Sequence, residues 1–519
     1  MRTSLHDLLR DAAAAWPDAP ALTYRDETIT YADAWAGATG AAVLLRGLGL
    51  ERGDRVAIFL EKRIEAVLAM FAATAAGGMF VPINHVLKSA QVAHILTDSG
   101  ARVLVTSGDR LGHLAADLAG TAVEHVIVVG AMPSTAPTRA VHSWSTAQAA
   151  STAGEGVVDA IDLDPAAILY TSGSTGSPKG VVLSHRNLIV GAESVSTYLG
   201  NTSADVILSV LPLSFDAGLS QVTTAFSVGA HCVLVNYLLA RDVPKLCARH
   251  GVTGITGVPP LWLQLIDAAW PDAAAQSLRY FANTGGRMPR AALERLRAIF
   301  PGATPFLMYG LTEAFRSTYL DPAEIDRRPD SIGKAIPNAQ ILVLRHDGTP
   351  CAPGEEGELV HRGALVTLGY WGDPVRTAER YRPIARSAGP WRSAEVAVWS
   401  GDTVVADDEG FLYFVGRRDD MIKTSGYRVS PTEIEEAAYS TGMVRDAVAF
   451  GIPDDALGQR IVLVATPATA DVETDALNTA LRQRLPLYMV PGRIELRSHL
   501  HRSPNGKFDR NLIKAEVHA

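Results

Sequence analysis

A run rich in glycine and hydroxyl side chains, residues 170–180, directly follows the apolar segment 166–169. Its glycines let several backbone N–H groups converge, its hydroxyls add further donors, and Lys179 adds a positive charge. Converging donors beside a cation are what a phosphate group requires. The Walker pattern does not fit, because Pro178 stands five residues after Gly173 where that pattern needs glycine. The run therefore predicts a phosphate-binding loop between two strands rather than a flexible linker.

This loop is the first of a series of short motifs that extends almost to the C-terminus. The others are Met308-Tyr309-Gly310-Leu311-Thr312-Glu313, Ser400-Gly401-Asp402, Gly416-Arg417-Arg418-Asp419, Ile422-Lys423-Thr424-Ser425-Gly426-Tyr427-Arg428-Val429, Glu433-Ile434-Glu435 and Asn505-Gly506-Lys507. In order and spacing the series resembles the adenylate-forming superfamily of acyl-CoA synthetases, peptide-synthetase adenylation domains and luciferases. Residues 309–337 are most similar to a subgroup of acyl-CoA ligases often found near bacterial exosortase systems.

The resemblance implies an AMP-forming ligase, which activates a carboxylic acid with MgATP to an acyl-adenylate and releases pyrophosphate. The acyl group then passes to a thiol, and coenzyme A is the first expectation. A catalytically silent binder on the same scaffold would have lost Glu313, Asp402 or Lys507, and all three are present. No residue demands the oxygen chemistry of a luciferase. An enzyme that uses ATP, Mg²⁺ and coenzyme A is therefore expected.

The resemblance also implies a nucleotide site. Tyr309 is similar to the aromatic residue that stacks on adenine, and Asp402 to the carboxylate that accepts hydrogen bonds from both ribose hydroxyls. Arg417 is expected near the ribose and phosphate. The implied nucleotide-binding residues are Thr171, Ser172, Gly173, Ser174, Thr175, Gly176, Lys179, Gly286, Arg287, Tyr309, Gly310, Thr312, Asp402, Arg417 and Lys507.

Four residues carry the implied chemistry, namely Lys179, Thr312, Glu313 and Lys507. Glu313 resembles the ligand of the magnesium ion, which bridges the phosphates while a carboxylate attacks the α-phosphorus. Thr312 resembles a hydroxyl that contacts phosphate. Lys507 is similar to the lysine that bridges the substrate carboxylate, the phosphate and a ribose oxygen, a point contact that suits a compact ammonium group.

The resemblance places the acyl pocket in the segment 211–220. Its Phe-Asp pair is similar to the peptide-synthetase pattern, in which the aspartate holds the amino group of an amino acid, and also to a fatty acyl-AMP ligase pattern without a bound amine. The spacing after Asp216 weakens the amino-acid option, but both substrates stay open. Arg316, just beyond Glu313, could face a second carboxylate or a polar tail of the substrate, but a surface salt bridge is the first expectation. The implied pocket residues are Phe215, Asp216, Gly218, Leu219, Trp262, Gly285, Leu311, Ala314 and Phe315.

The acceptor is left open among three kinds of molecule. Lys423 and Gly426 match the family's tunnel for a pantetheine thiol, which serves coenzyme A and the phosphopantetheine of a carrier protein alike. An amine acceptor, giving an amide, is the third option. Asp419 matches the hinge about which the family's small domain swings.

The pattern of strands and helices predicts an α/β fold. Two series of alternating strands and helices, before and after residue 150, predict two βα subdomains. Short alternating strands beyond Pro337 are typical of a small β-barrel or sandwich, and a small barrel is expected. The resemblance implies that these units form a large N-terminal domain, residues 1–417, and that residues 418–519 form a small, mobile α+β domain that carries Lys507.

Composition limits the remaining choices. Lys plus Arg is 47 against 55 Asp plus Glu, giving a net charge of −8, which provides no basic footprint for nucleic acid. The apolar run 66–83 is broken by glycine and proline, so a buried helix followed by a buried strand is predicted rather than a membrane span. Three widely spaced cysteines argue against a disulfide framework and favour the cytoplasm. A monomer and a homodimer both stay open.

Overall fold

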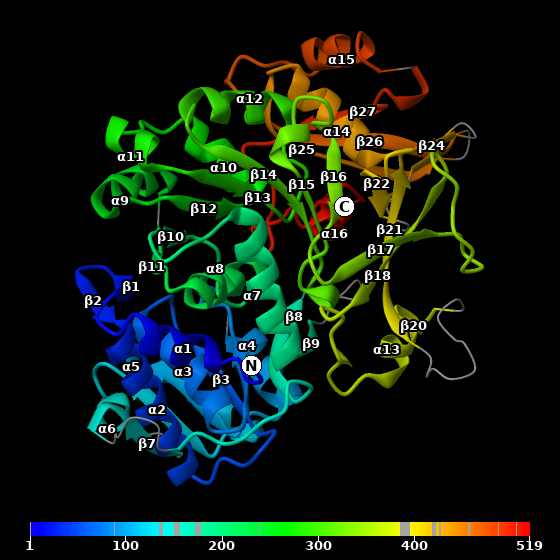
Figure 1. Cartoon of the computed structure of the whole chain (residues 1–519). Helices are drawn as coiled ribbons and strands as arrows, with labels where there is room; N and C mark the ends of the chain where they lie inside the picture. The colour runs from blue at the N-terminus through cyan, green and yellow to red at the C-terminus, as the bar shows by residue number, and fades with distance from the viewer. Residues whose placement is uncertain are drawn as a thin grey trace.

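The computed structural model of the 519-residue chain describes residues 2–87, 89–133, 139–149, 156–171, 178–237, 239–384, 395–417, 422–424, 427–454, 457–485, 487–504 and 506–518. The described residues form three β-sheets with helices packed around them (Figure 1). The colour in Figure 1 passes from a blue and cyan unit, through a green unit and yellow strands, to an orange and red C-terminal unit.

The first sheet has eight strands in the order β19-β9-β8-β4-β3-β5-β6-β7. Strands β3 to β8 pair in parallel, whereas β9 and β19 are added antiparallel at one edge. Parallel neighbours need crossover connections, and helices supply most of them. The strands are β3 (Arg55–Phe59), β4 (Met79–Pro82), β5 (Val103–Ser107), β6 (His125–Val129), β7 (Ala140–Ser143), β8 (Pro165–Thr171), β9 (Lys179–Ser184) and β19 (Gly369–Tyr370). The helices of this unit are α2 (Tyr31–Gly47), α3 (Ile64–Ala75), α4 (Ser89–Ser99), α5 (Gly108–Leu114), η1 (Asp117–Gly120) and α6 (Trp144–Ala149).

The apolar run 66–83 is the buried helix α3 followed by the buried strand β4, as the sequence predicts. Among the described residues, no helix combines the length and the apolar character that a bilayer crossing needs.

The second sheet has fourteen strands. Its parallel half consists of β1 (Pro20–Tyr24), β10 (Val206–Ser209), β11 (His231–Leu234), β12 (Gly254–Gly257), β13 (Tyr280–Asn283) and β14 (Thr304–Tyr309), with β2 (Glu27–Thr30) antiparallel at its edge. The associated helices are α1 (Asp7–Ala15), α7 (His185–Leu199), α8 (Asp216–Val228), η2 (Ala240–Asp242), α9 (Val243–His250), α10 (Pro259–Ile266), α11 (Asp272–Ser277) and α12 (Arg290–Ile299).

An antiparallel half continues this sheet where the sequence predicts a small barrel. It contains β15 (Thr318–Leu320), β16 (Ser331–Ala335), β17 (Ala339–Leu344), β18 (Glu356–Gly363), β20 (Tyr381–Pro383), β21 (Val396–Ala406) and β22 (Leu412–Arg417). The short helices η3 (Thr312–Ala314), η4 (Pro322–Glu324) and α13 (Pro374–Arg380) lie between them in the chain. In the described part of the chain, the strand order continues from β15 through β16, β22, β21 and β18 to β17, and no ladder closes these strands into a barrel.

One core joins the first two sheets, because helices from both units share it. Phe226 of α8 lies 5.7 Å from the ring of Tyr31 in α2 and 5.1 Å from that of Phe71 in α3. The Tyr31 hydroxyl also donates a 2.6 Å hydrogen bond to the carbonyl oxygen of Ala230. The two sheets are therefore held as one packed body, with α7 and α8 between them (Figure 1).

The third sheet is smaller and has its own cores. Its strands are β23 (Ile422–Thr424), β24 (Tyr427–Val429), β25 (Val444–Asp454), β26 (Gly458–Pro467) and β27 (Arg493–Leu496), and its helices are α14 (Pro431–Ser440), α15 (Thr474–Arg482), η5 (Leu487–Met489) and α16 (Arg510–His518). The predicted α/β class, with a large N-terminal part and a small α+β C-terminal part, is confirmed. The predicted boundary at residues 417 and 418 adjoins residues 418–421, which lie outside the described residues.

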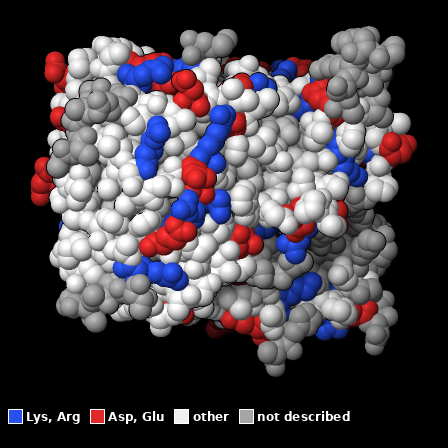
Figure 2. Space-filling view, turned by 90° about the horizontal axis from the view of Figure 1, so that it is seen from below, with Lys and Arg blue, Asp and Glu red and all other residues white. Residues whose placement is uncertain are grey.

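Charges on the surface are interleaved rather than segregated by sign. Figure 2 shows one face of the molecule, on which basic and acidic side chains lie close together. Ion pairs join charged side chains of opposite sign, as between Arg102 and Glu124 at 2.7 Å.

Gly333 allows β16 to join the two halves of the second sheet. Its φ is +81°, and a Cβ atom there would lie 1.8 Å from the carbonyl oxygen of Tyr319. Gly354 has a similar φ of +79° but nothing within 4 Å of its Cβ position.

Gly354→Ala is expected to cost about 1–2 kcal/mol through backbone strain alone. Gly333→Ala adds a clash with rigid backbone, so its cost should reach roughly 3 kcal/mol or more. Thermal unfolding of both variants checks this, and equal losses in Tm would contradict the close approach at β16.

Candidate active site

The predicted phosphate loop connects two paired strands. Strands β8 and β9 are antiparallel, and Thr171 at the end of β8 is the register partner of Lys179 at the start of β9. Ser172, Gly173, Ser174, Thr175 and Gly176 lie outside the described residues. The Thr171 hydroxyl is buried and has no hydrogen-bond partner among the described residues, so it is available to a ligand.

Lys179 and Glu313, predicted from separate motifs, meet in one cluster with Tyr370. The Lys179 ammonium lies 3.0 Å from Glu313 Oε1 and donates a 2.7 Å hydrogen bond to the Tyr370 hydroxyl. That hydroxyl donates a 2.6 Å hydrogen bond to the same carboxylate oxygen, and Lys179 Nζ lies 4.1 Å from the centroid of the tyrosine ring. The three side chains come from β9, η3 and β19.

The electrostatics of this cluster keep Glu313 ionised. Burial alone would raise the pKa of its carboxyl group, but the positive charge of Lys179 and the hydrogen bonds from Tyr370 and Lys179 lower it to about 2. Burial and the adjacent Glu313 charge raise the pKa of the Tyr370 hydroxyl, so it stays a proton donor. The site thus presents an acceptor-only carboxylate next to a fixed cation.

The main chain at Glu313 is fixed as well. Its carbonyl oxygen accepts hydrogen bonds from the backbone N–H of Thr367 at 3.0 Å and from the Thr367 hydroxyl at 2.9 Å. The Tyr381 hydroxyl lies 2.6 Å from that same threonine hydroxyl. Residues 367–381, to which the sequence analysis assigns no role, therefore hold the predicted magnesium ligand in place.

The donor set at Glu313 fits a magnesium ion. Mg²⁺ in nucleotide sites is held by one or two carboxylates together with phosphate oxygens and water. Among the described residues no group of three or more His, Cys, Asp or Glu side chains could hold a metal by itself. An ion at Glu313 would accordingly depend on the phosphates of the nucleotide.

Tyr309 and Asp402, the two residues expected near adenosine, are in contact. The hydroxyl of Tyr309, the last residue of β14, donates a hydrogen bond to Oδ2 of Asp402 in β21. Asp402 is buried, and Arg417 is its register partner on β22. The structure brings these three positions together, although it describes only the main chain of Arg417.

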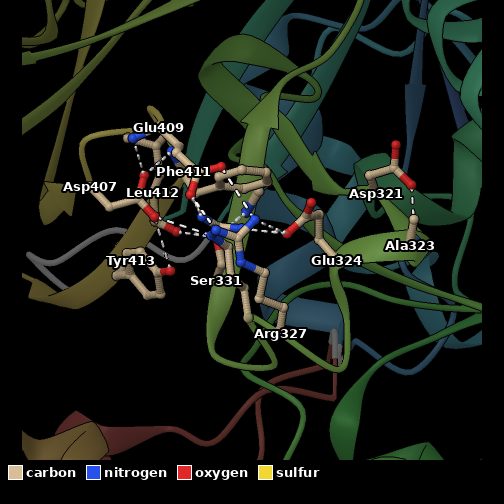
Figure 3. A network of polar contacts seen from close by, with 12 residues as sticks. Asp321, Ala323, Glu324, Arg327, Ser331, Asp407, Glu409, Phe411, Leu412 and Tyr413 are labelled. Atoms are coloured by element: carbon tan, nitrogen blue, oxygen red, sulfur yellow. Dashed lines mark hydrogen bonds and ion pairs between the residues drawn. The ribbon is translucent and has the colours of Figure 1, made fainter.

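An ion-pair network anchors the turn beyond Asp402 (Figure 3). The buried Arg328 side chain binds Glu324, Glu409 and Asp407, the last at 3.2 Å, and lies 4.1 Å from the centroid of Phe411. Asp407 accepts a 2.8 Å hydrogen bond from the N–H of Phe411, which closes the turn between β21 and β22. This network fixes the register of the strand that carries Asp402.

The C-terminal unit contributes Lys507 to the same region. Its Nζ lies 5.3 Å from the centroid of the Phe215 ring, and its Cε lies 3.3 Å from the position that a Cβ on Gly285 would occupy. The turn that carries it is closed by a 2.7 Å hydrogen bond from the N–H of Ser503 to the carbonyl of Lys507. Asn84 binds the neighbouring carbonyl of Pro504 at 2.9 Å, so the lysine turn lies against the large N-terminal part.

Arg287 lies in an ion pair, with its Nη2 atom 2.6 Å from Asp330 Oδ1. Arg287 follows Gly285 and Gly286 just beyond the end of β13, where the backbone is expected to approach the nucleotide. Glu436 of α14 accepts a 3.3 Å hydrogen bond from the N–H of Arg290, so this strand end also contacts the C-terminal unit.

The predicted acyl-pocket residues Phe215 and Trp262 belong to one hydrophobic core. Phe215 lies at its edge against Lys507, and Trp262 is fully buried against Phe281, with ring centroids 5.7 Å apart. Phe315 is also fully buried, packed against Gly191 of α7. Gly218, Leu219 and Ala314 are buried, and Leu311 is partly buried.

The expectation for Arg316 is wrong. Its side chain is only 4% exposed and pairs with the equally buried Asp216, with 3.5 Å between Nη1 and Oδ2. The sequence suggests a surface salt bridge because arginine is mostly exposed in proteins, but the fold turns this one inward.

Tyr370 is the functional residue that the sequence analysis misses. Nothing in its neighbourhood separates it from an ordinary core tyrosine, and only the antiparallel pairing of β19 with β9 brings it to Lys179. For the predicted thiol tunnel, the main chain of Lys423 lies in β23, but its side chain and Gly426 are outside the described residues. The predicted hinge, Asp419, is outside them too.

Comparison with known proteins agrees with this arrangement. Residues 9–371 match the family described as AMP-binding enzyme, and residues 433–507 match the AMP-binding enzyme C-terminal domain. A long-chain-fatty-acid–CoA ligase of Salmonella typhimurium is 30% identical over 99% of this chain and 94% of its own length.

Two solved structures are similar over nearly their whole length. The anthranilate CoA ligase AuaEII in complex with anthranoyl-AMP has a TM-score of 0.88 and 22% identity, covering 99% of this chain and 97% of that chain, which shows the shared fold. The o-succinylbenzoate CoA synthetase of Bacillus subtilis, in complex with its acyl-adenylate intermediate, has a TM-score of 0.83 and 27% identity, covering 99% and 98%. The chain belongs to the family of AMP-binding enzymes.

Proposed function

We propose that this enzyme is an AMP-forming acid–thiol ligase that makes acyl-coenzyme A. In the first step an oxygen of the substrate carboxylate attacks the α-phosphorus of ATP, and pyrophosphate leaves. In the second step the thiolate of coenzyme A attacks the acyl carbon, and AMP leaves. The relatives named as CoA ligases support coenzyme A as the acceptor.

The observation that carries this proposal is the convergence of the motifs at one edge of the second sheet. Strands β10, β12, β13 and β14 are parallel neighbours, and site segments follow three of them, β10, β13 and β14. Phe215 and Asp216 come after β10, Gly285 after β13, and Glu313 after β14. The carboxyl ends of parallel strands form the crevice where open α/β sheets bind ligands.

Each side chain has a role that its contacts support. Lys179 would bind phosphate oxygens, and Glu313 would hold the magnesium ion. The ion, when bound, supplies positive charge that neutralises the phosphates. Asp402 would accept the ribose hydroxyls, since a buried carboxylate can accept two hydrogen bonds at once. Lys507 would place its ammonium where charge develops during attack on the α-phosphorus.

Residues 1–417 and 418–519 would act as two domains. In the structure the lysine turn lies at the site, which suits the first step. The second step needs space for a thiol, so we propose that the small domain turns about Asp419 and brings Lys423 and Gly426 to the thiol. Both substrates, ATP and coenzyme A, are cytoplasmic metabolites, and we propose the same location for the enzyme.

The amino-acid alternative is not favoured, because Asp216 already has a cationic partner in Arg316. An experiment distinguishes coenzyme A from a carrier-protein thiol and from an amine as the acceptor of the acyl group. Pyrophosphate release from MgATP is measured with panels of carboxylic and amino acids, using hydroxylamine as a trap, and then with coenzyme A, a carrier protein or an amine. Acid-dependent release followed by thioester formation on coenzyme A is expected, and transfer only to a carrier protein or an amine would contradict coenzyme A as acceptor.

Lys507→Ala should lower acid-dependent exchange of pyrophosphate into ATP by roughly 10²–10³, the loss typical of one transition-state donor. Consumption of preformed acyl-adenylate by the thiol should stay largely intact. Lys514→Ala, in α16, is the matched control and should change neither rate. Equal loss of both activities in Lys507→Ala would contradict a role confined to the first step.

Tyr370→Phe removes the hydroxyl that links Lys179 and Glu313 but keeps the ring. We expect KM for MgATP to rise about 10-fold or more, since hydrogen bonds to charged groups contribute 1.5–3 kcal/mol. Tyr439→Phe is the control, because the Tyr439 hydroxyl accepts a 3.1 Å hydrogen bond from the N–H of Ala447 in the C-terminal unit, away from this cluster. An unchanged KM in a stably folded Tyr370→Phe would show that the hydroxyl does not organise the site.

A further inference from the structure

A buried ion pair joins the acyl segment to the nucleotide segment. Arg316 lies three residues after Glu313, and Asp216 lies in the first turn of α8. Arg316 Nη1 is 3.5 Å from Asp216 Oδ2, and both side chains are only 4% exposed. Neither residue is needed for the chemistry of adenylation, so the pair calls for another explanation.

The position of the pair is at the reaction site. Asp216 follows Phe215, whose ring faces Lys507 at 5.3 Å. Arg316 Nη1 lies 3.7 Å from the position that a Cβ on Gly310 would occupy, directly after the adenosine-site residue Tyr309. The guanidinium is thus placed between the backbone of the nucleotide motif and the start of the acyl segment.

Within the described part of the chain, most of the hydrogen-bonding capacity of this guanidinium is unused. Arginine carries five N–H donors. The Arg316 side chain donates no hydrogen bond to any described residue. It pairs with Asp216, lies 5.6 Å from the Phe315 ring and interacts electrostatically with Tyr198. Buried polar groups are normally satisfied by protein, water or ligand. The donors of Arg316 therefore suit an acceptor on the bound acid.

The charge of the pair limits what that acceptor can be. Together Arg316 and Asp216 are neutral, so an ammonium group or a second carboxylate on the substrate would leave a net charge buried, which is costly. A hydroxyl or carbonyl oxygen accepts from the guanidinium without changing the net charge. Asp216 would then hold Arg316 in place instead of binding an amine.

We infer that Arg316, held by Asp216, determines specificity and selects an acid whose tail is uncharged and carries a hydroxyl or carbonyl oxygen. This inference rests on the proposed function, because it names the substrate class of the same adenylation site.

The test measures kcat/KM for acid-dependent pyrophosphate release with short and medium straight-chain acids. At each chain position, four matched substituents are compared: hydrogen, hydroxyl or oxo, amino, and carboxyl. The best hydroxy or oxo acid should exceed its unsubstituted parent by about 10- to 100-fold, the range of a hydrogen bond to a charged group. It should exceed the charged analogues by at least as much.

Three variants of the pair sharpen the test. Asp216→Asn leaves the guanidinium charge uncompensated and should shift preference towards the dicarboxylic acid. Arg316→Met leaves the carboxylate uncompensated and should shift preference towards the amino-substituted acid. The double variant is neutral and covers the case in which a single variant fails to fold; it should still activate the parent acid while losing the hydroxyl preference.

Arg279→Met is the matched control. Arg279 pairs with Asp205 at 2.9 Å on the second sheet, away from the acyl segment, so this variant should not change the order of substrates. Wild-type preference for an unsubstituted or charged acid would overturn the inference while leaving the proposed function intact, and so would a double variant that keeps the hydroxyl preference. Failure of the wild type to activate any acid would refute the proposed function, and the inference with it.

Discussion

The contact among Lys179, Glu313 and Tyr370 is the interaction on which the site depends, because its three members come from segments that the chain brings together only when both large sheets are formed. Lys179 and Tyr370 are at the edge of the first sheet, and Glu313 follows β14 of the second. A partly buried carboxylate is tolerated only beside compensating charge and hydrogen bonds. An error in the packing of one sheet on the other would therefore leave an uncompensated charge at the phosphate site.

The shared core makes that alignment stable. Helices α2 and α3 of the first unit pack on α8 of the second through Tyr31, Phe71 and Phe226. The same α8 begins with Asp216, so the helix that holds the sheets together also starts at the acyl segment. Close-packed interiors transmit displacement rather than absorb it. The position of the acyl segment relative to the phosphate loop is thus set by the core.

The sequence predicts most of the candidate site, because most of its residues lie in short motifs of adjacent residues. The phosphate loop, the motif around Glu313, Asp402 and Lys507 each consist of adjacent residues whose order along the chain can be recognised, and the structure brings Lys179 to Glu313 and Tyr309 to Asp402. Tyr370 cannot be predicted from the sequence, since its place in the site arises from the pairing of β19 with β9, which brings it to Lys179, 191 positions away in the chain. The burial of Arg316 cannot be predicted for a related reason: the residue type favours the surface, and only the tertiary fold buries it with Asp216.

The alternation of apolar and polar residues beyond Pro337 predicts antiparallel strands, but this alternation does not say whether the last strand of the series pairs with the first.

The turn at Phe315 would couple the acyl recognition proposed for Arg316 to the nucleotide binding proposed for Glu313. Phe315 has a φ of +51°, which a residue with a bulky side chain adopts only at a cost of about 1–3 kcal/mol. Its ring is fully buried, and a Cβ on Gly191 would come within 2.4 Å of it, so the helix α7 has room for the ring only because position 191 is glycine. The strained turn sends Phe315 into the core and the next residue, Arg316, towards Asp216, while Glu313 just before it faces Lys179. Because the core fixes the two buried residues between them, Ala314 and Phe315, Glu313 and Arg316 cannot move independently, and a change that displaces Arg316 from Asp216 should also strain the segment that carries the proposed magnesium ligand.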